Sequence, residues 1–124
     1  MKKIITLVLL CTAFISKAQT NAIKTETVAT TYKNGKVKSK GIVKDNKLEG
    51  EWTYYYDNGK VALKKNFVDG VPTGQWSFYN EKGELSMKID DIAKIDNGAS
   101  LSLIKDGKVI TTKKVTKDNV ILKF

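Results

Sequence analysis

Apolar side chains alternate with other residues along several short segments of the chain, and each such segment ends in a turn signal. In residues 52–56 large apolar side chains occupy every second position, which is the period of a half-buried strand. The pair Asn58-Gly59 follows, and it tolerates the positive φ angles of a tight hairpin. Residues 61–67 then alternate again. The pattern predicts a β-hairpin, and no segment keeps a helical period over a dozen residues.

This hairpin pattern returns at intervals of 24 residues. The segment GEWTYYYDNGKV at 50–61 is followed by GQWSFYNEKGEL at 74–85, and shorter matches fall at 32–37 and 106–109. A fixed period in this range is typical of a repeat array, in which each unit buries its apolar face against its neighbours. The predicted fold class is all-β, an elongated antiparallel meander of stacked β-hairpin repeats. The structural repeat positions are Gly50, Trp52, Gly59, Gly74, Trp76 and Gly83.

The chain divides into four predicted parts. Residues 1–18 combine a basic start, an apolar run and a small-residue end, which indicates a secretory signal peptide too short for a membrane anchor. Residues 19–27 are expected to be a flexible lead-in and residues 28–97 the hairpin repeats. Residues 98–124 are expected to be degenerate strands that cap the array. We therefore expect an exported protein, periplasmic or extracellular, without a transmembrane segment after cleavage.

Composition narrows the range of functions. The single cysteine, Cys11, lies in the predicted signal peptide, so the mature chain has no disulfide and depends on packing. Removing the signal peptide also removes three lysines and no acid, which lowers the formal net charge from +9 to +6. Every basic residue is lysine. Because specific nucleic-acid recognition relies on arginine, its absence argues against a DNA or RNA reader, whereas affinity for acidic surfaces stays open.

Two residue types that often carry catalysis are missing from the predicted mature chain. Without histidine or a mature cysteine, the chain has no imidazole base, no thiol nucleophile and no usual zinc site. Asp90, Asp91 and Asp96 lack the alternating oxygen ligands of a calcium loop. Glu49 and Glu51 are expected to be strand-edge charges rather than a catalytic pair. The sequence therefore predicts no catalytic residue, no cofactor and no metal site, and we do not expect an enzyme.

The aromatic residues are the remaining candidates. Alternation places Trp52 and Tyr54 on one face, and stacking of the repeats is expected to set Trp52 beside Trp76 and Tyr54 beside Phe78 as cross-strand ladders.

The opposite face of the predicted sheet is expected to stay partly open. Tyr32, Tyr55 and Tyr79 are placed on that side as possible partner-binding residues, because a single-layer sheet has few elements to cover it. The partner could be a protein, a glycan or a lipid headgroup.

Residues 50–60, with Asp69-Gly70 and residues 74–76, resemble the bacterial variant of the MORN repeat. The resemblance covers residues 50–86 well, residues 28–49 fairly, and little beyond 90. It implies successive hairpins in an elongated sheet, and members act as protein-interaction or membrane-proximal modules. Related bacterial sequences are often labelled antitoxin-like, and export of such a chain favours an immunity or scaffold protein.

Two functions follow from these observations. The first is an exported, non-catalytic module that binds a protein partner by its open face or by strand addition at a sheet edge. The alternative is an envelope protein whose lysines and exposed aromatic residues bind anionic lipid or polysaccharide.

Overall fold

The computed structural model of the protein describes residues 22–119. The predicted signal peptide and the start of the predicted lead-in lie outside these residues. So does the strand expected at the C-terminal end, around Val120 to Leu122. Within the described part, no helix has the length and apolar character needed to cross a membrane.

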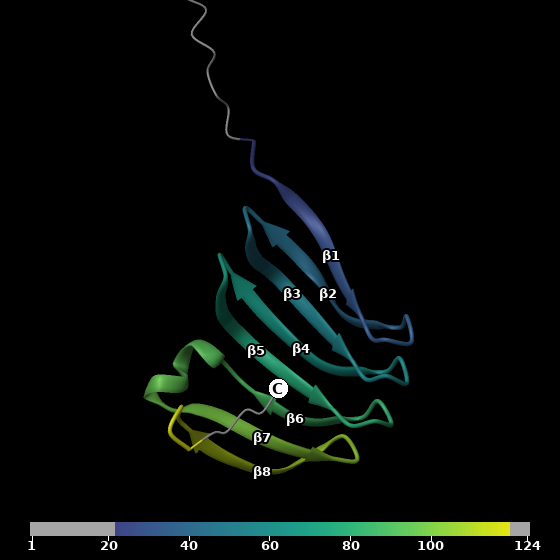
Figure 1. The fold of residues 1–124 in the computed structure, drawn as a ribbon. Coiled ribbons are helices and arrows are strands. Elements are labelled where there is room, and N and C mark those ends of the chain that lie inside the picture. Colours follow the sequence, from purple (N-terminus) through teal and green to yellow (C-terminus); the bar gives the residue numbers. More distant parts are fainter. Residues whose placement is uncertain (1–21, 120–124) are drawn as a thin grey trace, which may run out of the picture.

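The described chain forms a single antiparallel sheet in which every strand pairs with the next one in the sequence (Figure 1). The strands, in order, are β1 (Thr25–Thr31), β2 (Val37–Lys44), β3 (Lys47–Tyr55), β4 (Val61–Val68), β5 (Val71–Tyr79), β6 (Leu85–Ile89), β7 (Ala99–Lys105) and β8 (Lys108–Val115). One short 3-10 helix, η1 (Ile92–Asn97), joins β6 to β7. The predicted all-β hairpin meander is confirmed, and β1 begins inside the segment expected to be a flexible lead-in.

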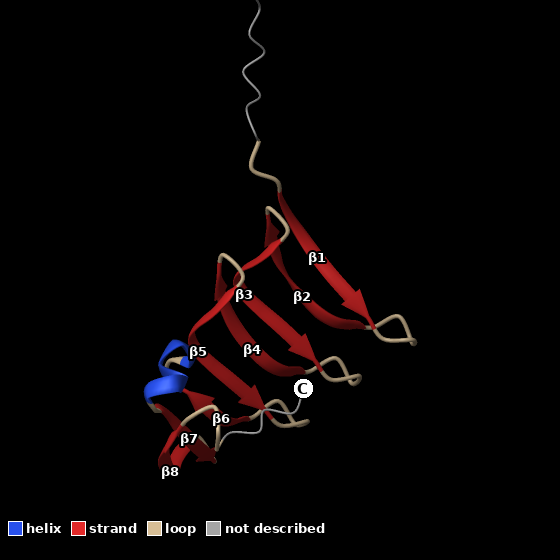
Figure 2. Ribbon diagram, turned by 60° about the vertical axis from the view of Figure 1, so that its left-hand side comes forward, coloured by secondary structure: helices blue, strands red, loops and turns tan. Residues whose placement is uncertain are grey.

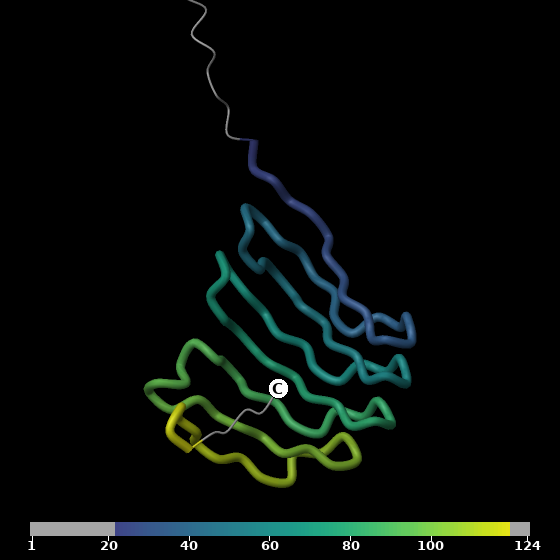
Figure 3. Tube along the Cα trace, viewed as in Figure 1, coloured from purple at the N-terminus to yellow at the C-terminus, as the bar shows by residue number. Residues whose placement is uncertain are grey.

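The hairpins β1–β2, β3–β4 and β5–β6 have the same turn. The backbone N–H groups of Tyr32, Tyr56 and Asn80 each donate to the carbonyl oxygen four residues later, at 2.8, 2.8 and 2.9 Å. The last residue of each turn is a glycine, at 35, 59 and 83, with a positive φ that other residues rarely adopt. In the returning strand one residue is left without a partner, at 38, 62 and 86. The three turns stack at one end of the sheet (Figure 3).

The last hairpin of the described sheet, β7–β8, has a turn that is shorter by one residue than those of β1–β2, β3–β4 and β5–β6. Its turn is Asp106-Gly107, two residues with φ angles of 52° and 71°, flanked by the pair Lys105 and Lys108. Because this turn is shorter, β7 is shifted by one position relative to the earlier hairpins. Trp76 pairs with Ile89, and Ile89 pairs with Leu101. Leu101 therefore takes the place in this row that the 24-residue spacing from Trp76 would give to Ser100.

The Gly-x-Trp motif forms a second kind of bulge. Opposite the single residue Gly41 of β2, β3 places three residues, Gly50-Glu51-Trp52, and Gly50 has a positive φ of 68°. The same insertion recurs in β5 at Gly74-Gln75-Trp76, opposite Lys65 of β4. In the first copy the indole lies flat over Gly41, where a Cβ atom would overlap its ring. The motif thus seats each tryptophan over the preceding strand.

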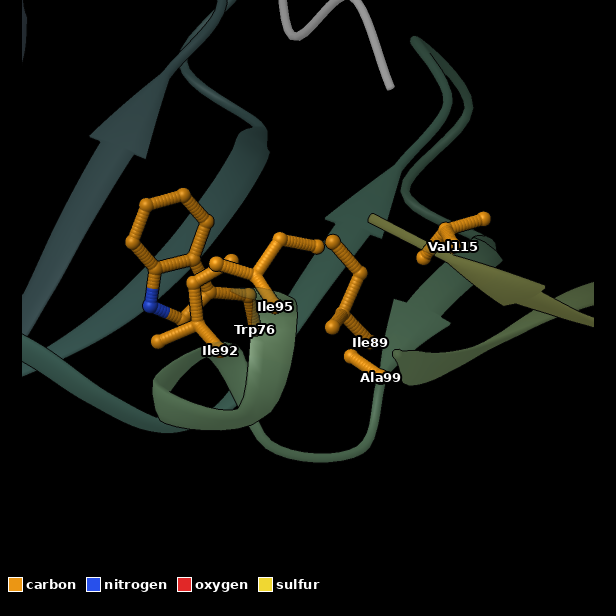
Figure 4. Packing of buried hydrophobic residues seen from close by; sticks show 6 residues of the cluster. All are labelled: Trp76, Ile89, Ile92, Ile95, Ala99 and Val115. Carbon is orange, nitrogen blue, oxygen red and sulfur yellow. The ribbon is translucent and has the colours of Figure 1, made fainter. Parts of the chain in front are cut away.

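The strand register assigns side chains to two faces of the sheet. The packed face contains the buried residues Trp52, Leu63, Phe67, Trp76 and Ile89. Helix η1 lies against this face beside β5 (Figure 2). Its residues Ile92 and Ile95 pack with Trp76, Ile89, Ala99 and Val115 to form the main hydrophobic cluster (Figure 4).

The alternation pattern did not predict η1, because six residues are too few to display a helical period. Local polar contacts define it instead. The Asp91 side chain accepts the Ala93 N–H at 3.1 Å, and Gly98 ends the helix with a φ of 92°.

The three aspartates considered for calcium have separate roles. Asp90 Oδ1 accepts the backbone N–H groups of Asp91 and Ser100, at 2.8 and 2.7 Å. Asp91 caps η1, and Asp96 pairs with Lys117 at 2.8 Å. Among residues 22–119, no three acidic, histidine or cysteine side chains gather in a group able to hold a metal ion.

Candidate functional site

The three tyrosines expected on one open side do not form a single row. Tyr55 and Tyr79 lie on the face opposite the packed one, two residues beyond Thr53 and Ser77 in their strands, and both are half-buried. Tyr32 instead begins a hairpin turn, as Tyr56 does one repeat later. The expected placement of Tyr32 beside Tyr55 and Tyr79 was therefore wrong, because counting 24 residues from position 32 gives 56 rather than 55, while a partner-binding role for the three tyrosines stays a prediction.

Tyr32 and Tyr56 join neighbouring repeats. The Tyr32 hydroxyl donates to the Tyr55 carbonyl oxygen at 2.6 Å, and the Tyr56 hydroxyl donates to the Tyr79 carbonyl oxygen at 2.6 Å. Two more contacts follow the same direction: Asn58 donates to the Glu81 carbonyl at 3.1 Å and Lys60 to the Lys82 carbonyl at 2.9 Å. These bonds satisfy the polar groups of one hairpin with the backbone of the next.

A hollow of about 330 Å³ lies among these tyrosines. Its lining residues are Tyr32, Lys38, Tyr54, Tyr55, Tyr56, Ala62, Leu63 and Lys65. The surface is mainly apolar, and the phenols of Tyr32 and Tyr56 already donate to the backbone. We therefore regard this tyrosine hollow chiefly as a seam between repeats.

Lys65 is a buried lysine in the packed face, with 8% of its surface exposed. Its Nζ lies 5.0 Å from the centre of the Tyr54 ring and 4.7 Å from that of Trp76. Burial lowers the pKa of Lys65, and burial also raises the pKa of Tyr54. The two rings provide the cation–π environment that makes a buried ammonium tolerable.

The expected aromatic ladders are absent for a simple geometrical reason. One repeat contains two strands, so equivalent residues lie two strands apart and β4 runs between them. Trp52 pairs with Lys65, and Leu63 lies between Tyr54 and Phe78. The aromatic rings are thus bridged by aliphatic and ammonium groups rather than stacked on each other.

The opposite face, here called the polar face, carries a regular row of side chains across the strands. Each member is paired in register with the next. From β2 to β8 the row reads Lys40, Thr53, Lys64, Ser77, Lys88, Ser102 and Thr112. Lysines and hydroxyl groups alternate over its first six members, and Tyr55 and Tyr79 lie beside it. Sequence reasoning missed this row because its members belong to different strands and only the register brings them together.

The two edges of the described sheet differ in character. Edge strand β1 has the sequence TETVATT, with no lysine or proline and one charged residue. Edge strand β8 has the sequence KVITTKKV, with three lysines. Lysines on an edge strand discourage pairing with another chain, so β8 is protected and β1 is not.

A family model described as MORN repeat variant matches residues 48–69. The match spans most of β3, the Asn58-Gly59 turn and β4, which together form one hairpin of the sheet. It supports a MORN-repeat protein, and such repeats suggest a repeat-based binding module. Comparison with curated proteins and with solved structures gave no match.

Proposed function

We propose that the protein is an exported, non-catalytic module that binds a protein partner by strand addition at the free edge of β1. The observation that carries the proposal is the contrast between the unprotected β1 edge and the lysine-rich β8 edge. In strand addition, main-chain hydrogen bonds supply affinity and side-chain contacts supply specificity. The match to a repeat-based binding family supports a binding role.

The hydrogen bonds at the two ends of β1 indicate which backbone groups face outward. The Lys24 carbonyl accepts the Asp45 N–H at 2.8 Å, and the Tyr32 N–H donates to the Lys36 carbonyl at 2.8 Å. The backbone N–H and C=O groups of the even-numbered residues of β1 therefore hydrogen-bond to β2. Since the direction alternates along an antiparallel strand, the N–H and C=O groups of Thr27 and Ala29 point away from the sheet.

The partner is expected to be a scaffolded envelope protein or, in an immunity role, a toxin held inactive. Both roles use the same edge. The only charge within β1, Glu26, is paired with Lys24 at 3.4 Å, so an incoming strand meets little electrostatic resistance.

The test uses a substitution that removes one outward donor. Thr27→Pro deletes an N–H that faces away from β2, so the β1–β2 pairing should persist while strand addition is blocked. Thr27→Ala keeps that N–H and serves as the matched control. The mature chain, crosslinked in its own cell envelope and recovered at high salt, should retain the same protein with Thr27→Ala and lose it with Thr27→Pro.

The recovered protein must also slow amide hydrogen exchange at Thr27 and Ala29 when the two are mixed in purified form. Recovery that is equal for both variants, or exchange that does not change in β1, would refute strand addition. A toxin whose activity is suppressed by the wild-type chain would assign the immunity role.

A second candidate function is association with an anionic envelope surface, lipid or polysaccharide, through lysines and exposed aromatic side chains. The specific observation in its favour is the lysine row of the polar face. Binding of that kind should weaken as salt shortens the screening length below about 8 Å, its value at 0.15 M. Strand addition, which rests on main-chain hydrogen bonds, should persist at the same salt.

A further inference from the structure

We propose that the polar face is a binding track for a linear acidic polysaccharide, with carboxylates bound by Lys40, Lys64 and Lys88 and sugar rings placed on Tyr55 and Tyr79. This site is distinct from the β1 edge, and it does not depend on strand addition.

The spacing of the three lysines is the first argument. They lie on β2, β4 and β6 in one row, linked through Thr53 and Ser77 by the strand register. Adjacent strands are about 4.8 Å apart, so neighbouring lysines are separated by about 9.6 Å and the outer two by about 19 Å. A disaccharide unit of an extended glycan has about this length, so a polymer with one carboxylate per disaccharide would meet one lysine per repeat.

The surface between the charges is the second argument. Thr53 offers a half-buried hydroxyl group in the row, whereas Ser77 is only 8% exposed and its hydroxyl oxygen accepts the Gln75 amide at 3.1 Å. Asn66 and Gln75 carry amide groups on the same face, where Asn66 donates to the Gln75 carbonyl at 3.0 Å and Gln75 donates to the Ser77 hydroxyl at 3.1 Å. Tyr55 and Tyr79 supply half-buried rings along one side of the row. Hydroxyl, amide and aromatic groups are what a sugar ring needs for hydrogen bonds and for contact with its apolar face.

Two hollows mark the ends of the track. One, of about 370 Å³, is lined in part by Lys40, Thr53 and Tyr55. The other, of about 470 Å³, is lined in part by Lys88 and Leu85, and also by the carboxylates of Glu84 and Asp106, which disfavour an acidic group at its rim. Helix η1 packs on the opposite face, so within residues 22–119 it leaves the row uncovered. Within the row Lys40 is exposed and Lys64 and Lys88 are half-buried, so the ammonium groups are accessible to a ligand, whereas Ser77 and Ser102 are buried.

The arrangement favours a sugar polymer over two other polyanions. Duplex DNA carries a charge about every 1.7 Å, far denser than these lysines. A bilayer presents anionic headgroups in two dimensions, whereas the three ammonium groups form a single line.

One acidic side chain opposes binding at the centre of the track. Glu51 lies 3.3 Å from the Lys64 ammonium, whose side chain is 37% exposed. A ligand carboxylate must share Lys64 with Glu51. The substitution Glu51→Gln should therefore strengthen binding, which a purely structural role for the row would not produce.

The experiment titrates the mature chain with hyaluronate oligosaccharides of two to eight sugars, in which every second sugar carries a carboxylate, by calorimetry at low salt. Affinity should rise with length up to the hexasaccharide, whose three carboxylates match three lysines, and then level off. Replacing the row lysines together should weaken hexasaccharide binding by about tenfold. That variant is Lys40→Gln, Lys64→Gln and Lys88→Gln.

A control with the same change in net charge removes three exposed lysines at turns. It is Lys33→Gln, Lys36→Gln and Lys108→Gln, and it should change affinity by less than about twofold. Circular dichroism and thermal unfolding verify that every variant is folded. The row variant Lys40→Gln, Lys64→Gln and Lys88→Gln should still recover the protein partner of the β1 edge, which separates this proposal from strand addition.

Three results would overturn the proposal. Equal losses in the two triple variants would show that only net charge matters. Affinity that does not depend on oligosaccharide length would exclude a track. Binding to phosphatidylglycerol vesicles that depends on the row lysines, without binding to the oligosaccharides, would assign the row to a lipid surface instead.

Discussion

Gly41 provides the sharpest test of how the Gly-x-Trp motif works. The Trp52 indole lies flat over Gly41, and an added Cβ atom would overlap the ring. Its φ is outside the left-handed region, so the backbone itself accepts alanine. At such a position Gly→Ala normally stabilises a protein by about 0.4–1 kcal/mol, because the unfolded chain loses freedom. The contact with Trp52 should reverse that sign.

The magnitude follows from two costs of Gly41→Ala. Forcing extra volume into a packed site costs about 1–3 kcal/mol. Displacing the indole also breaks the hydrogen bond from Trp52 Nε1 to the Ile42 carbonyl at 3.0 Å, worth about 0.5–1.5 kcal/mol. We expect the free energy of unfolding to fall by about 2–4 kcal/mol. For a domain of this size the unfolding temperature should fall by at least about 8 °C.

The assay is urea denaturation followed by circular dichroism, in a double-mutant cycle with Trp52→Leu. In the Trp52→Leu background the added methyl group has room, so Gly41→Ala should be neutral or slightly stabilising. The coupling between the two sites should then be about 2 kcal/mol or more. A Gly41→Ala variant that is as stable as the wild type, or that costs the same in both backgrounds, would refute the role assigned to the indole contact.

Two further predictions concern the packed face. Burial lowers the pKa of Lys65 in the folded chain. Between that lowered pKa and the ordinary value of 10.5, the unfolded chain therefore binds more protons than the folded chain. In this pH window the free energy of unfolding, compared with that of Lys65→Met, should rise with pH. Urea denaturation of both proteins from about pH 8 to about pH 10 checks this, and the range lies below that in which the raised pKa of Tyr54 acts in the opposite sense. A difference in unfolding free energy that does not change with pH would contradict the prediction. Tyr56→Phe should lower the free energy of unfolding by about 1 kcal/mol, since it removes the bond to the Tyr79 carbonyl. Tyr55→Phe is the control in the same denaturation assay, and an equal loss in both would show that the bond contributes nothing.

The sequence predicted the hairpins well because their signals are local. The turn at Asn58-Gly59 and the alternation on either side of it lie within one short segment, and the structure places β3 and β4 there. The sequence could not predict relations across strands. The sheet register decides that Lys65 lies between the repeats' tryptophans and that Tyr32 corresponds to Tyr56.

The binding surfaces show the same limit. Tyr55 and Tyr79 could be recognised as a pair from the sequence because they occupy equivalent positions in two consecutive repeats. The lysines beside them were not, since surface lysines are common and only pairing through Thr53 and Ser77 aligns them. Helix η1 escaped notice because its boundaries depend on the cap at Asp91 rather than on any period.

The strict order of the strands also has a mechanical consequence. The first and last strands of the described chain, β1 and β8, are the two opposite edges of the sheet. Tension applied through β1 and β8 would act along the hydrogen bonds and load them one at a time. The strands would separate one after another at low force, instead of rupturing together in shear. A protein built this way would lengthen gradually under load between two anchored partners.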